Sequence, residues 1–493
     1  MRTRILEITA CLGLLLITGC SADSAATTDL GGDLHAHSSD ASVTRDTLSP
    51  PPQDSSTEGM QDSEAPTPAA TWALGFGDAA DESGASVAVD AQGNIVLVGH
   101  FMGQLNLGGP PLDAQSAIAG FIASFDAAGK HRWSKALGKS GKIYPRSVGV
   151  DNVGHIVIAG DFSESLDIGS TTLQSAGRSD LFVASFDATG AARWGMRVGG
   201  ASWDTSAGLA LSPTGDIFIG GDFSGEITLG AETLTSAGGT DGLLVRISNA
   251  GVPAWAHRYG GSSDDRVYDV AMAGKDALVV GGYFRESMLV GATTLTAKGN
   301  RDGFIAAVDT AGVATWGKSF GGKDGYAEVS GVAVDAAGRI AVIGAYSTAI
   351  ELLGQSYSGG DSFEIFVTSL DADGAGRWGS VHGQGYPVDV AIDPAQQIVI
   401  SGQLLPGGGD FGARLGTFGM ADVFLAVLDA TGSATWTGSF GSGQDDRGAG
   451  VAVDPQSGVI WQTGSFSADL TLGTTALTHV GGSDVFVARY SLE

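Results

Sequence analysis

Residues 316–344 read WGKSFGGKDGYAEVSGVAVDAAGRIAVIG, and the order of these residues predicts strands. A Trp opens a short run that ends in Phe-Gly-Gly, and a polar loop follows. Two Val- and Ile-rich runs, 331–335 and 340–344, then flank a tight Ala-Ala-Gly turn. Short β-branched and aromatic runs punctuated by Gly and Asp are strand signals. A fourth run at 365–370 completes the unit before the next Trp.

The same unit recurs along the chain from residue 71 onward. Its tryptophans are spaced by 61, 61, 61, 61, 62 and 58 residues, at Trp72, Trp133, Trp194, Trp255, Trp316, Trp378 and Trp436. A fixed period identifies a repeat architecture, and four strands per unit are typical of a propeller blade. The sequence therefore predicts an all-β fold, a seven-bladed β-propeller with four-stranded blades of about 61 residues over residues 71–493.

The ends of the repeat array predict how the ring closes. The last unit stops after 485–490, where its Trp strand would follow, and the first unit carries a spare Trp strand at 71–76. We expect this N-terminal strand to pair into the last blade. A closed ring has no unpaired first and last blade, which an open array would have to cap.

The units resemble the bacterial β-propeller repeat family known by the initials SBBP. The resemblance is carried by stretches such as 439–446 (SFGSGQDD) followed by 450–454 (GVAVD), and it covers all seven units. It implies a propeller fold and an extracytoplasmic setting. It transfers no catalytic residue to this chain.

The first 19 residues have the features of a signal peptide. Two arginines precede a short apolar run at 8–17, and small residues precede Cys20. Residues 17–20 (ITGC) resemble the lipobox of bacterial lipoproteins, which implies a lipid on the Cys20 thiol and cleavage just before it. Ser21 in the next position implies sorting to the outer membrane or cell surface. Cys11 and Cys20 are the only cysteines, so the mature chain has no internal disulfide.

Residues 20–70 are predicted to be a disordered tether behind the lipidated Cys20. The segment 21–70 has no Phe, Trp or Tyr, and it has nine acidic residues against Arg45 alone. Such a composition buries too little apolar surface to order itself. Asp33, His35 and His37 match a D-x-H-x-H metal motif, but that motif needs a strand end to aim it. We interpret it as solvated linker.

Five aromatic side chains are the candidate ligand contacts. They lie in the links between successive units, at Tyr144, Trp203, Tyr268, Tyr326 and Tyr386. Alternate connections of an up-and-down blade share a face, so these links lie on one elaborated face. Aromatic rings there would offer flat contact area to sugars or peptide side chains. The alternative is that they pack between neighbouring blades.

Two sets of acidic residues also recur. The first lies in the same links, at Asp81, Glu82, Asp204, Asp264, Asp265, Asp324, Asp445 and Asp446; the second comes just before each last apolar run, at Asp180, Asp241, Asp302, Glu364, Asp422 and Asp484, with Ala119 in the first unit. Carboxylates in Gly-rich loops can bind Ca²⁺. Recurrence in every copy favours turn capping instead, so the sequence predicts no metal site, with Ca²⁺ as the open alternative.

The function that these features predict is a lipid-anchored extracytoplasmic binding or scaffolding module for protein or glycan ligands. A net charge of −28 disfavours nucleic acid and anionic lipid surfaces, so the lipid anchor alone would hold the protein, as a monomer, at a membrane. The alternative is a glycan- or peptide-acting enzyme at the propeller mouth, with unit six and its 404–409 segment as the most asymmetric place. A G-x-S-x-G match at 317–321 lies on a predicted strand, without the strand-to-helix elbow that such a nucleophile needs.

Overall fold

The computed structural model describes residues 70–491, and every structural statement below refers to that range. The predicted signal peptide (1–19), the lipidated Cys20 and the predicted tether (20–70) lie outside the described residues, apart from Ala70, which begins the first strand. Within the described range, no helix is long and apolar enough to cross a membrane.

Antiparallel four-stranded sets are the building unit of this part of the chain. The innermost strands are β2 (Glu82–Val89), β8 (Ile143–Val150), β14 (Asp204–Leu211), β18 (Arg266–Ala273), β24 (Tyr326–Val334), the second half of β29 (Gly376–Ile392) and β34 (Arg447–Val453). The second strands are β3 (Ile95–Phe101), β9 (Ile156–Phe162), β15 (Ile217–Leu229), β19 (Ala277–Phe284), β25 (Ile340–Ser347), β30 (Ile398–Asp410) and β35 (Ile460–Phe466).

The third and outermost strands complete each set. The third strands are β6 (Ala119–Phe125), β12 (Asp180–Phe186), β16 (Glu232–Ile247), β22 (Asp302–Asp309), β28 (Glu364–Leu370), β32 (Asp422–Leu428) and β38 (Asp484–Tyr490). The outermost strands, which carry the repeated Trp, are β7 (His131–Leu137), β13 (Ala192–Gly200), β17 (Pro253–Tyr259), β23 (Ala314–Phe320), the first half of β29, β33 (Ala434–Phe440) and β1 (Ala70–Phe76).

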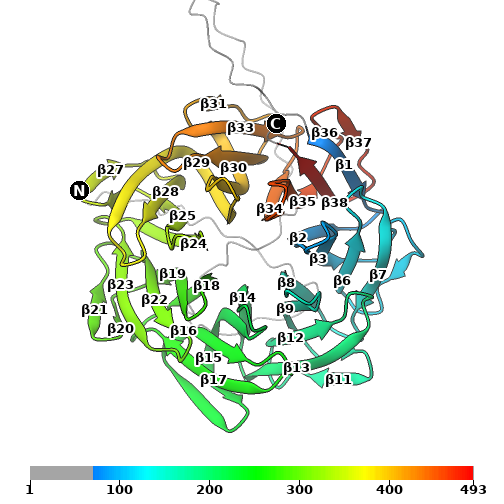
Figure 1. Ribbon diagram of the computed structural model, residues 1–493, viewed down its shortest axis with the longest axis horizontal. Helices are drawn as coiled ribbons and strands as arrows, with labels where there is room; N and C mark the ends of the chain where they lie inside the picture. Colours follow the sequence, from blue (N-terminus) through cyan, green and yellow to red (C-terminus); the bar gives the residue numbers. More distant parts are fainter. Residues whose placement is uncertain (1–69, 492–493) are drawn as a thin grey trace, which may run out of the picture. The chain divides into compact units, whose positions relative to one another are not determined.

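The sets stand around one central axis (Figure 1). Each innermost strand contacts the innermost strand of the neighbouring set, in the order β2, β8, β14, β18, β24, β29 and β34, and β34 contacts β2. The long strand β29 leaves one set as its outermost strand and enters the next as its innermost. Twisted four-stranded sheets around an axis define a β-propeller. The strand order β1-β38-β35-β34 places the first and last strands of the described range in one blade, with Phe76 opposite Val485.

Short hairpins form within the connections between the second and third strands, where the sequence predicts no strand. The connection between the second and third strands folds back on itself in β4 (Gln104–Leu105) with β5 (Leu112–Asp113), β10 (Ser165–Ile168) with β11 (Thr171–Gln174), β20 (Ser287–Val290) with β21 (Thr293–Thr296), β26 (Ala349–Leu352) with β27 (Gln355–Ser358), and β36 (Leu470–Leu472) with β37 (Thr475–Leu477). In unit six, β31 (Arg414–Leu415) pairs with the end of β30 instead. Apolar side chains on one side of each hairpin, such as Leu166 and Leu173, are buried against the outermost strands.

Five of the seven repeated tryptophans donate a hydrogen bond to the next blade, whereas the buried Nε1 of Trp436 has no hydrogen-bond partner. Trp133 is packed in an apolar cluster built from two neighbouring blades, with Ile122 from one and Phe182 from the other. Its indole Nε1 donates a hydrogen bond of 3.1 Å to the carbonyl oxygen of Ala188, in the turn of the next blade. Trp194, Trp255, Trp316 and Trp378 donate the equivalent hydrogen bond at 3.0–3.3 Å. The Trp period seen in the sequence is therefore a period of blade-to-blade contacts.

Candidate functional site

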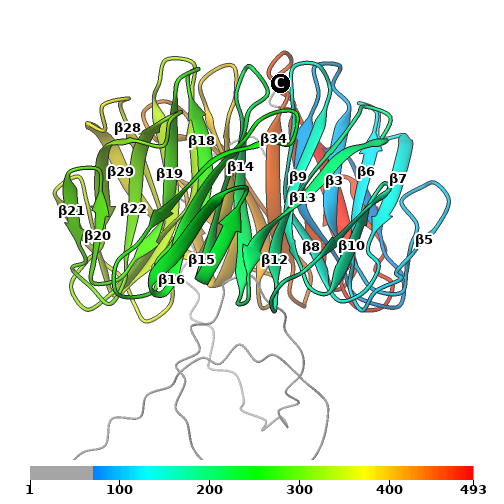
Figure 2. The same ribbon diagram turned by 90° about the horizontal axis from the view of Figure 1, so that it is seen from below.

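One face of the propeller carries the long connections from each second strand to the third. The links from each outermost strand to the next innermost strand lie on the same face but are as short as the turns of the opposite face, and within β29 the two strands are continuous. Backbone hydrogen bonds join the two kinds of link, from Met102 to Asp81 (3.1 Å) and from Ser163 to Lys142 (2.9 Å). We call this face the mouth face. Figure 2 shows the strands running from this face to the opposite one.

A single backbone hydrogen bond recurs on the mouth face wherever two blades meet. The amide at the start of an innermost strand donates to the carbonyl of the residue just before the third strand of the preceding blade. We call it the junction hydrogen bond; it spans 2.7–3.0 Å in Glu82→Ser483, Ile143→Ile118, Asp204→Ser179, Asp265→Thr240, Ala327→Arg301, Gly385→Phe363 and Asp446→Ala421. Each donor residue thereby lies beside the first residue of a neighbouring third strand.

The second acidic set predicted from sequence occupies that first position of the third strand. Each of its carboxylates accepts a hydrogen bond from the amide four residues earlier and so caps the preceding loop; the donors are Ala176, Ala237, Lys298, Gly360, Phe418 and Val480. The structure thus gives these residues the turn-capping role that recurrence favours.

The first acidic set divides into capping and exposed members. Glu82, Asp204, Asp265 and Asp446 are buried, and each accepts a hydrogen bond from the amide four residues earlier. Asp81, Asp264 and Asp445, which come directly before three of these buried residues, are more exposed. Asp324 lies three residues before the junction donor of its blade and has a positive φ of 60°. Burial raises the pKa of Asp204 to about 6, of Asp265 to about 7 and of Glu82 to about 8.

Two of the five predicted aromatics are open to solvent. Trp203 and Tyr326 each come directly before a junction donor, and their side chains are 50% and 40% exposed. The guanidinium of Arg178 lies 6.0 Å from the Trp203 ring centre, and that of Arg301 lies 5.8 Å from the Tyr326 ring centre. An arginine over an aromatic face is a cation–π arrangement. The Arg301 side chain is largely buried, with 11% exposure, so at Tyr326 the ring is open to solvent but the charge is not.

The other three predicted aromatics are half-buried and pack against neighbours. Tyr144 meets His100 edge-on at 5.0 Å, and Tyr268 meets Tyr283 at 5.5 Å. Tyr386 lies 5.3 Å from Phe363 of the adjoining blade. Burial raises the pKa of Tyr144 and of Tyr386 to about 12. These three tyrosines therefore pack against neighbouring side chains, as the alternative interpretation expected. Trp203 and Tyr326 remain as the candidate ligand contacts.

Ion pairs lie between these rings, around the axis. Arg146 pairs with Asp161 at 2.7 Å, and Arg301 pairs with Glu328 at 2.7 Å while it covers Tyr283 at 4.5 Å. Desolvation raises the pKa of Glu328, and the charge of Arg301 opposes that rise. Buried charges need such partners to be tolerated.

The sequence analysis missed the arginines of this network. Arg146, Arg178 and Arg301 look unremarkable in a single unit because the equivalent positions of other units carry unrelated residues. Arg178 and Arg301 share a signal, because they come two residues and one residue before a capping Asp of the third strand. A search for cations beside the recurrent acids would have found these two.

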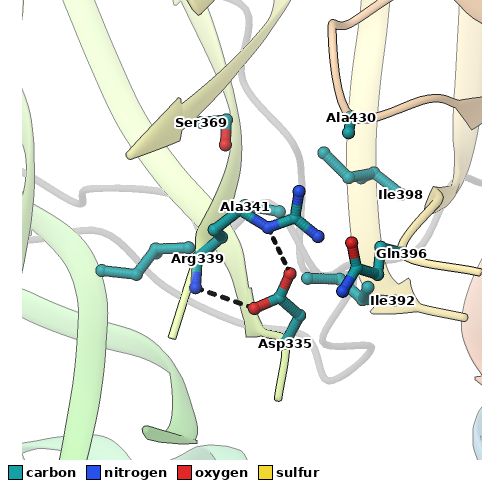
Figure 3. Close-up of a pocket in the computed structure, with 9 residues that line it drawn as sticks. Asp335, Arg339, Ala341, Ser369, Ile392, Gln396, Ile398 and Ala430 are labelled. Carbon is teal, nitrogen blue, oxygen red and sulfur yellow. Dashed lines mark hydrogen bonds and ion pairs between the residues drawn. The ribbon is translucent and has the colours of Figure 1, made fainter. Parts of the chain in front are cut away.

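The described residues also line two cavities. The first is lined by Asp335 and Arg339 on one side and by the turn at Gln396 of the next blade on the other. Figure 3 shows the Arg339 guanidinium hydrogen-bonded to Asp335. Its volume of about 10 Å³ has room for one water. The second, of about 540 Å³, is lined by His382, Asp410, Phe411 and Trp436 among others.

The larger cavity adjoins the asymmetric segment of unit six. The segment 404–409 lies inside β30, and the cavity begins at Asp410 directly after it. The His382 ring stacks on Phe411 at 4.2 Å, and its Nδ1 donates to the Asp410 carbonyl at 3.0 Å. Its Nε2 then accepts from the Ser380 hydroxyl at 2.8 Å. Burial lowers the pKa of His382, which favours the neutral form of the ring.

No group of three or more His, Cys, Asp or Glu side chains is placed to hold a metal ion within residues 70–491. The Asp33, His35 and His37 motif lies outside that range. Ser319 of the G-x-S-x-G match lies within β23, opposite Phe304.

Comparisons with known proteins add little beyond the fold. No family model matches the chain. Over 185 residues, 36% of the chain, it is 25% identical to the regulatory protein FlaEY of Caulobacter vibrioides, and it spans about a fifth (19%) of that protein. Similar solved structures are the Pan2 WD40 domain of Neurospora crassa (TM-score 0.42, 9% identity, 82% of this chain and 88% of that one) and the Dos1 propeller (0.40, 10%, 86% and 94%).

A protein of unknown function from Bacteroides caccae is also similar, with a TM-score of 0.35, 10% identity, and coverage of 65% of this chain and 89% of that one. The assignment of the chain to the β-propeller class rests on its own strand topology.

The junction geometry predicts that Gly441 is sterically required. A Cβ at Gly441 would overlap the carboxylate of Asp422, whereas a Cβ at Gly443 would meet nothing within 4 Å. Gly441→Ala should lower stability by about 1–3 kcal/mol, the usual cost of overpacking. The matched control Gly443→Ala should be neutral or slightly stabilising. Urea unfolding monitored by Trp fluorescence measures both, and equal midpoints would contradict the geometry.

Proposed function

We propose that the mature chain is a closed seven-bladed β-propeller that acts as a lipid-anchored, non-enzymatic binding or scaffolding module outside the cytoplasm. Closure is supported by the junction hydrogen bond, which recurs at seven places. One of them joins Glu82 to Ser483, across most of the described chain. The pairing of β1 with β38 supports the same closure.

The observation that carries the binding function is the exposure of Trp203 and Tyr326 at one repeated position. The residue before each junction donor is Asp81, Lys142, Trp203, Asp264, Tyr326, Gln384 or Asp445, so only two blades present an aromatic there. Each of the two has an arginine over its ring. Exposed aromatics with a nearby cation are typical anchors of protein and glycan ligands.

A glycan- or peptide-acting enzyme is the second candidate, and the Ser380–His382 pair favours it. The hydroxyl-to-imidazole hydrogen bond and the carbonyl that orients the ring have the layout of an activated nucleophile, beside the larger cavity. These residues stand on the outer part of a blade, away from the exposed aromatics. The two candidate functions therefore predict that different replacements abolish activity.

The anchor is proposed from sequence alone, at Cys20. Cys20→Ser removes the thiol that would carry the lipid and should move the protein from the membrane fraction to the soluble fraction. The readout is detergent phase partitioning of cells that express either form. Equal partitioning of the two would contradict lipid anchoring.

For ligand binding, we expect Trp203→Ala and Tyr326→Ala to weaken the strongest interaction of the detergent-solubilised protein on a glycan and peptide array. Loss of a central aromatic typically costs about 2 kcal/mol or more, or roughly 30-fold in Kd. Melting temperature should change little because both rings are exposed.

Val313→Ala, in an exposed turn between β22 and β23, is the matched control and should bind normally. Binding that survives both aromatic replacements would exclude the mouth site. Turnover of an arrayed ligand that disappears in Ser380→Ala would favour the enzyme instead.

A further inference from the structure

Four of the blade junctions bring two carboxyl groups together. The junction hydrogen bond sets each donor residue beside the first residue of the neighbouring third strand. The acidic pairs are Glu82 with Asp484, Asp204 with Asp180, Asp265 with Asp241, and Asp446 with Asp422, and all eight residues are buried, with exposures of 0–1%. Burial raises the pKa of Glu82, Asp204, Asp265 and Asp422, and repulsion from the partner carboxylate adds to each rise.

Each pair contains a carboxylate oxygen with no hydrogen-bond partner. The unpartnered atoms are Oδ1 of Asp180, Asp241, Asp422 and Asp484, together with Oε1 of Glu82. The other oxygen of each of these five side chains accepts from a backbone amide. An unsatisfied, fully buried carboxylate oxygen is rare in folded proteins and calls for a specific explanation.

The remaining junctions act as internal controls. Asp302 faces Ala327, and Glu364 faces Gly385, so neither has an acidic partner. Both oxygens of these two side chains have donors: Lys298 and Gly299 amides for Asp302, and the Gly360 amide and Tyr346 hydroxyl for Glu364. Among the acidic residues that begin the third strands, the unpartnered oxygen therefore occurs only where a second carboxyl group lies at the same junction.

The junction between Ile143 and Ala119 has no carboxyl group at all. Both side chains are buried, at 0% and 1% exposure. The same position in the fold thus accepts an apolar pair or an acidic pair. This is the behaviour expected of a dry site, in which two ionised carboxylates would repel each other strongly.

We propose that each of the four acidic pairs holds one proton between its two carboxyl groups at mildly acidic pH, and that these shared protons join neighbouring blades at the mouth face. The protonated member donates its O–H to the unpartnered oxygen of the other member. The donor and acceptor are then both satisfied, and the pair carries one negative charge instead of two. This inference concerns the scaffold and does not depend on which ligand the mouth binds.

A shared proton fits these atoms better than a bound cation. Ca²⁺ takes six to eight oxygen ligands, whereas these pairs present one or two free oxygens each. Asp180 and Asp241 also accept hydrogen bonds from the guanidinium groups of Arg197 and Arg258, which would repel a metal ion. A proton needs only the two facing oxygens.

Other charged groups also face the pairs. Asp78 faces Glu82, and His479 faces Asp484. Asp264 faces Asp265, and Asp445 faces both Asp422 and Asp446. The acidic neighbours add to the preference for a bound proton, while Arg197, Arg258 and His479 oppose it.

The pair at the junction of the first and last blades allows the sharpest test. Burial raises the pKa of Glu82 to about 8, whereas an unfolded Glu titrates near ~4.3. The folded protein then holds a proton that the unfolded chain releases. The stabilisation is complete below the unfolded pKa and is lost as the pH rises through about 8, so stability falls with rising pH over this window.

Glu82→Gln imitates the protonated state at every pH. Its amide oxygen can accept from the Asp78 amide, and its NH₂ group can donate to Oδ1 of Asp484. Between pH 5.5 and 8.5, we expect the melting temperature of the full-length variant to fall less than that of the wild type. At pH 6.5, its unfolding should release about one proton fewer than the wild type, measured by calorimetry in buffers of different ionisation enthalpy.

Glu164→Gln, at a solvent-facing turn between β9 and β10, is the matched control and should behave as the wild type. Asp484→Asn imitates the same protonated pair from the other side and serves if Glu82→Gln does not fold. Unchanged proton release and an unchanged pH slope in the folded variants would overturn the proposal. A rise in wild-type melting temperature with CaCl₂ at pH 7.5 that both amide variants lose would overturn it in favour of a cation.

Discussion

The backbone hydrogen bond between neighbouring blades is the constraint from which the mouth face follows. It joins the start of an innermost strand to the residue before a third strand, at 2.7–3.0 Å in every copy. Because it fixes two backbones side by side, it also fixes which side chains meet. The donor residue and the first residue of the third strand are buried together except at Glu364, which is partly buried, and the residue before each donor is partly or fully exposed. One repeated contact thereby sets a buried position and an open position in each blade.

The chemistry of the two positions follows from their surroundings. The buried position tolerates an apolar pair, as in Ile143 with Ala119, or carboxyl groups that each accept at least one hydrogen bond from a backbone amide. Glycine is needed beside it because a Cβ at Gly199 or Gly441 would overlap the capping carboxylate. The open position has no such restriction, so the blades differ there, and function can vary on a constant scaffold.

Much of the fold could be predicted from the sequence because the strands are determined by short, local patterns of residues. The Trp spacing and the Val/Ile runs indicate four strands per unit, and strands such as β25 and β28 lie where the runs predicted them. The sequence does not predict the hairpins between second and third strands, because strands of two to four residues leave too short a pattern. The half-buried tyrosines were predicted to lie in the links, but Tyr144, Tyr268 and Tyr386 lie within the innermost strands β8, β18 and β29. Their packing against partners such as Tyr283 and Phe363 depends on contacts that are not local in sequence. The acidic pairs join residues that are distant in sequence, up to the 402 positions that separate Glu82 from Asp484, so no local pattern reveals them.

Native-state hydrogen exchange at the junction amides tests the central claim most directly. These amides report the opening of each blade contact separately. If the ring is closed, the Glu82 amide exchanges as slowly as those of Ile143, Asp204, Asp265 and Asp446, and all of them exchange through global unfolding. If the Glu82 amide exchanges orders of magnitude faster than the other four, the first and last blades are not joined, and the closed propeller is wrong.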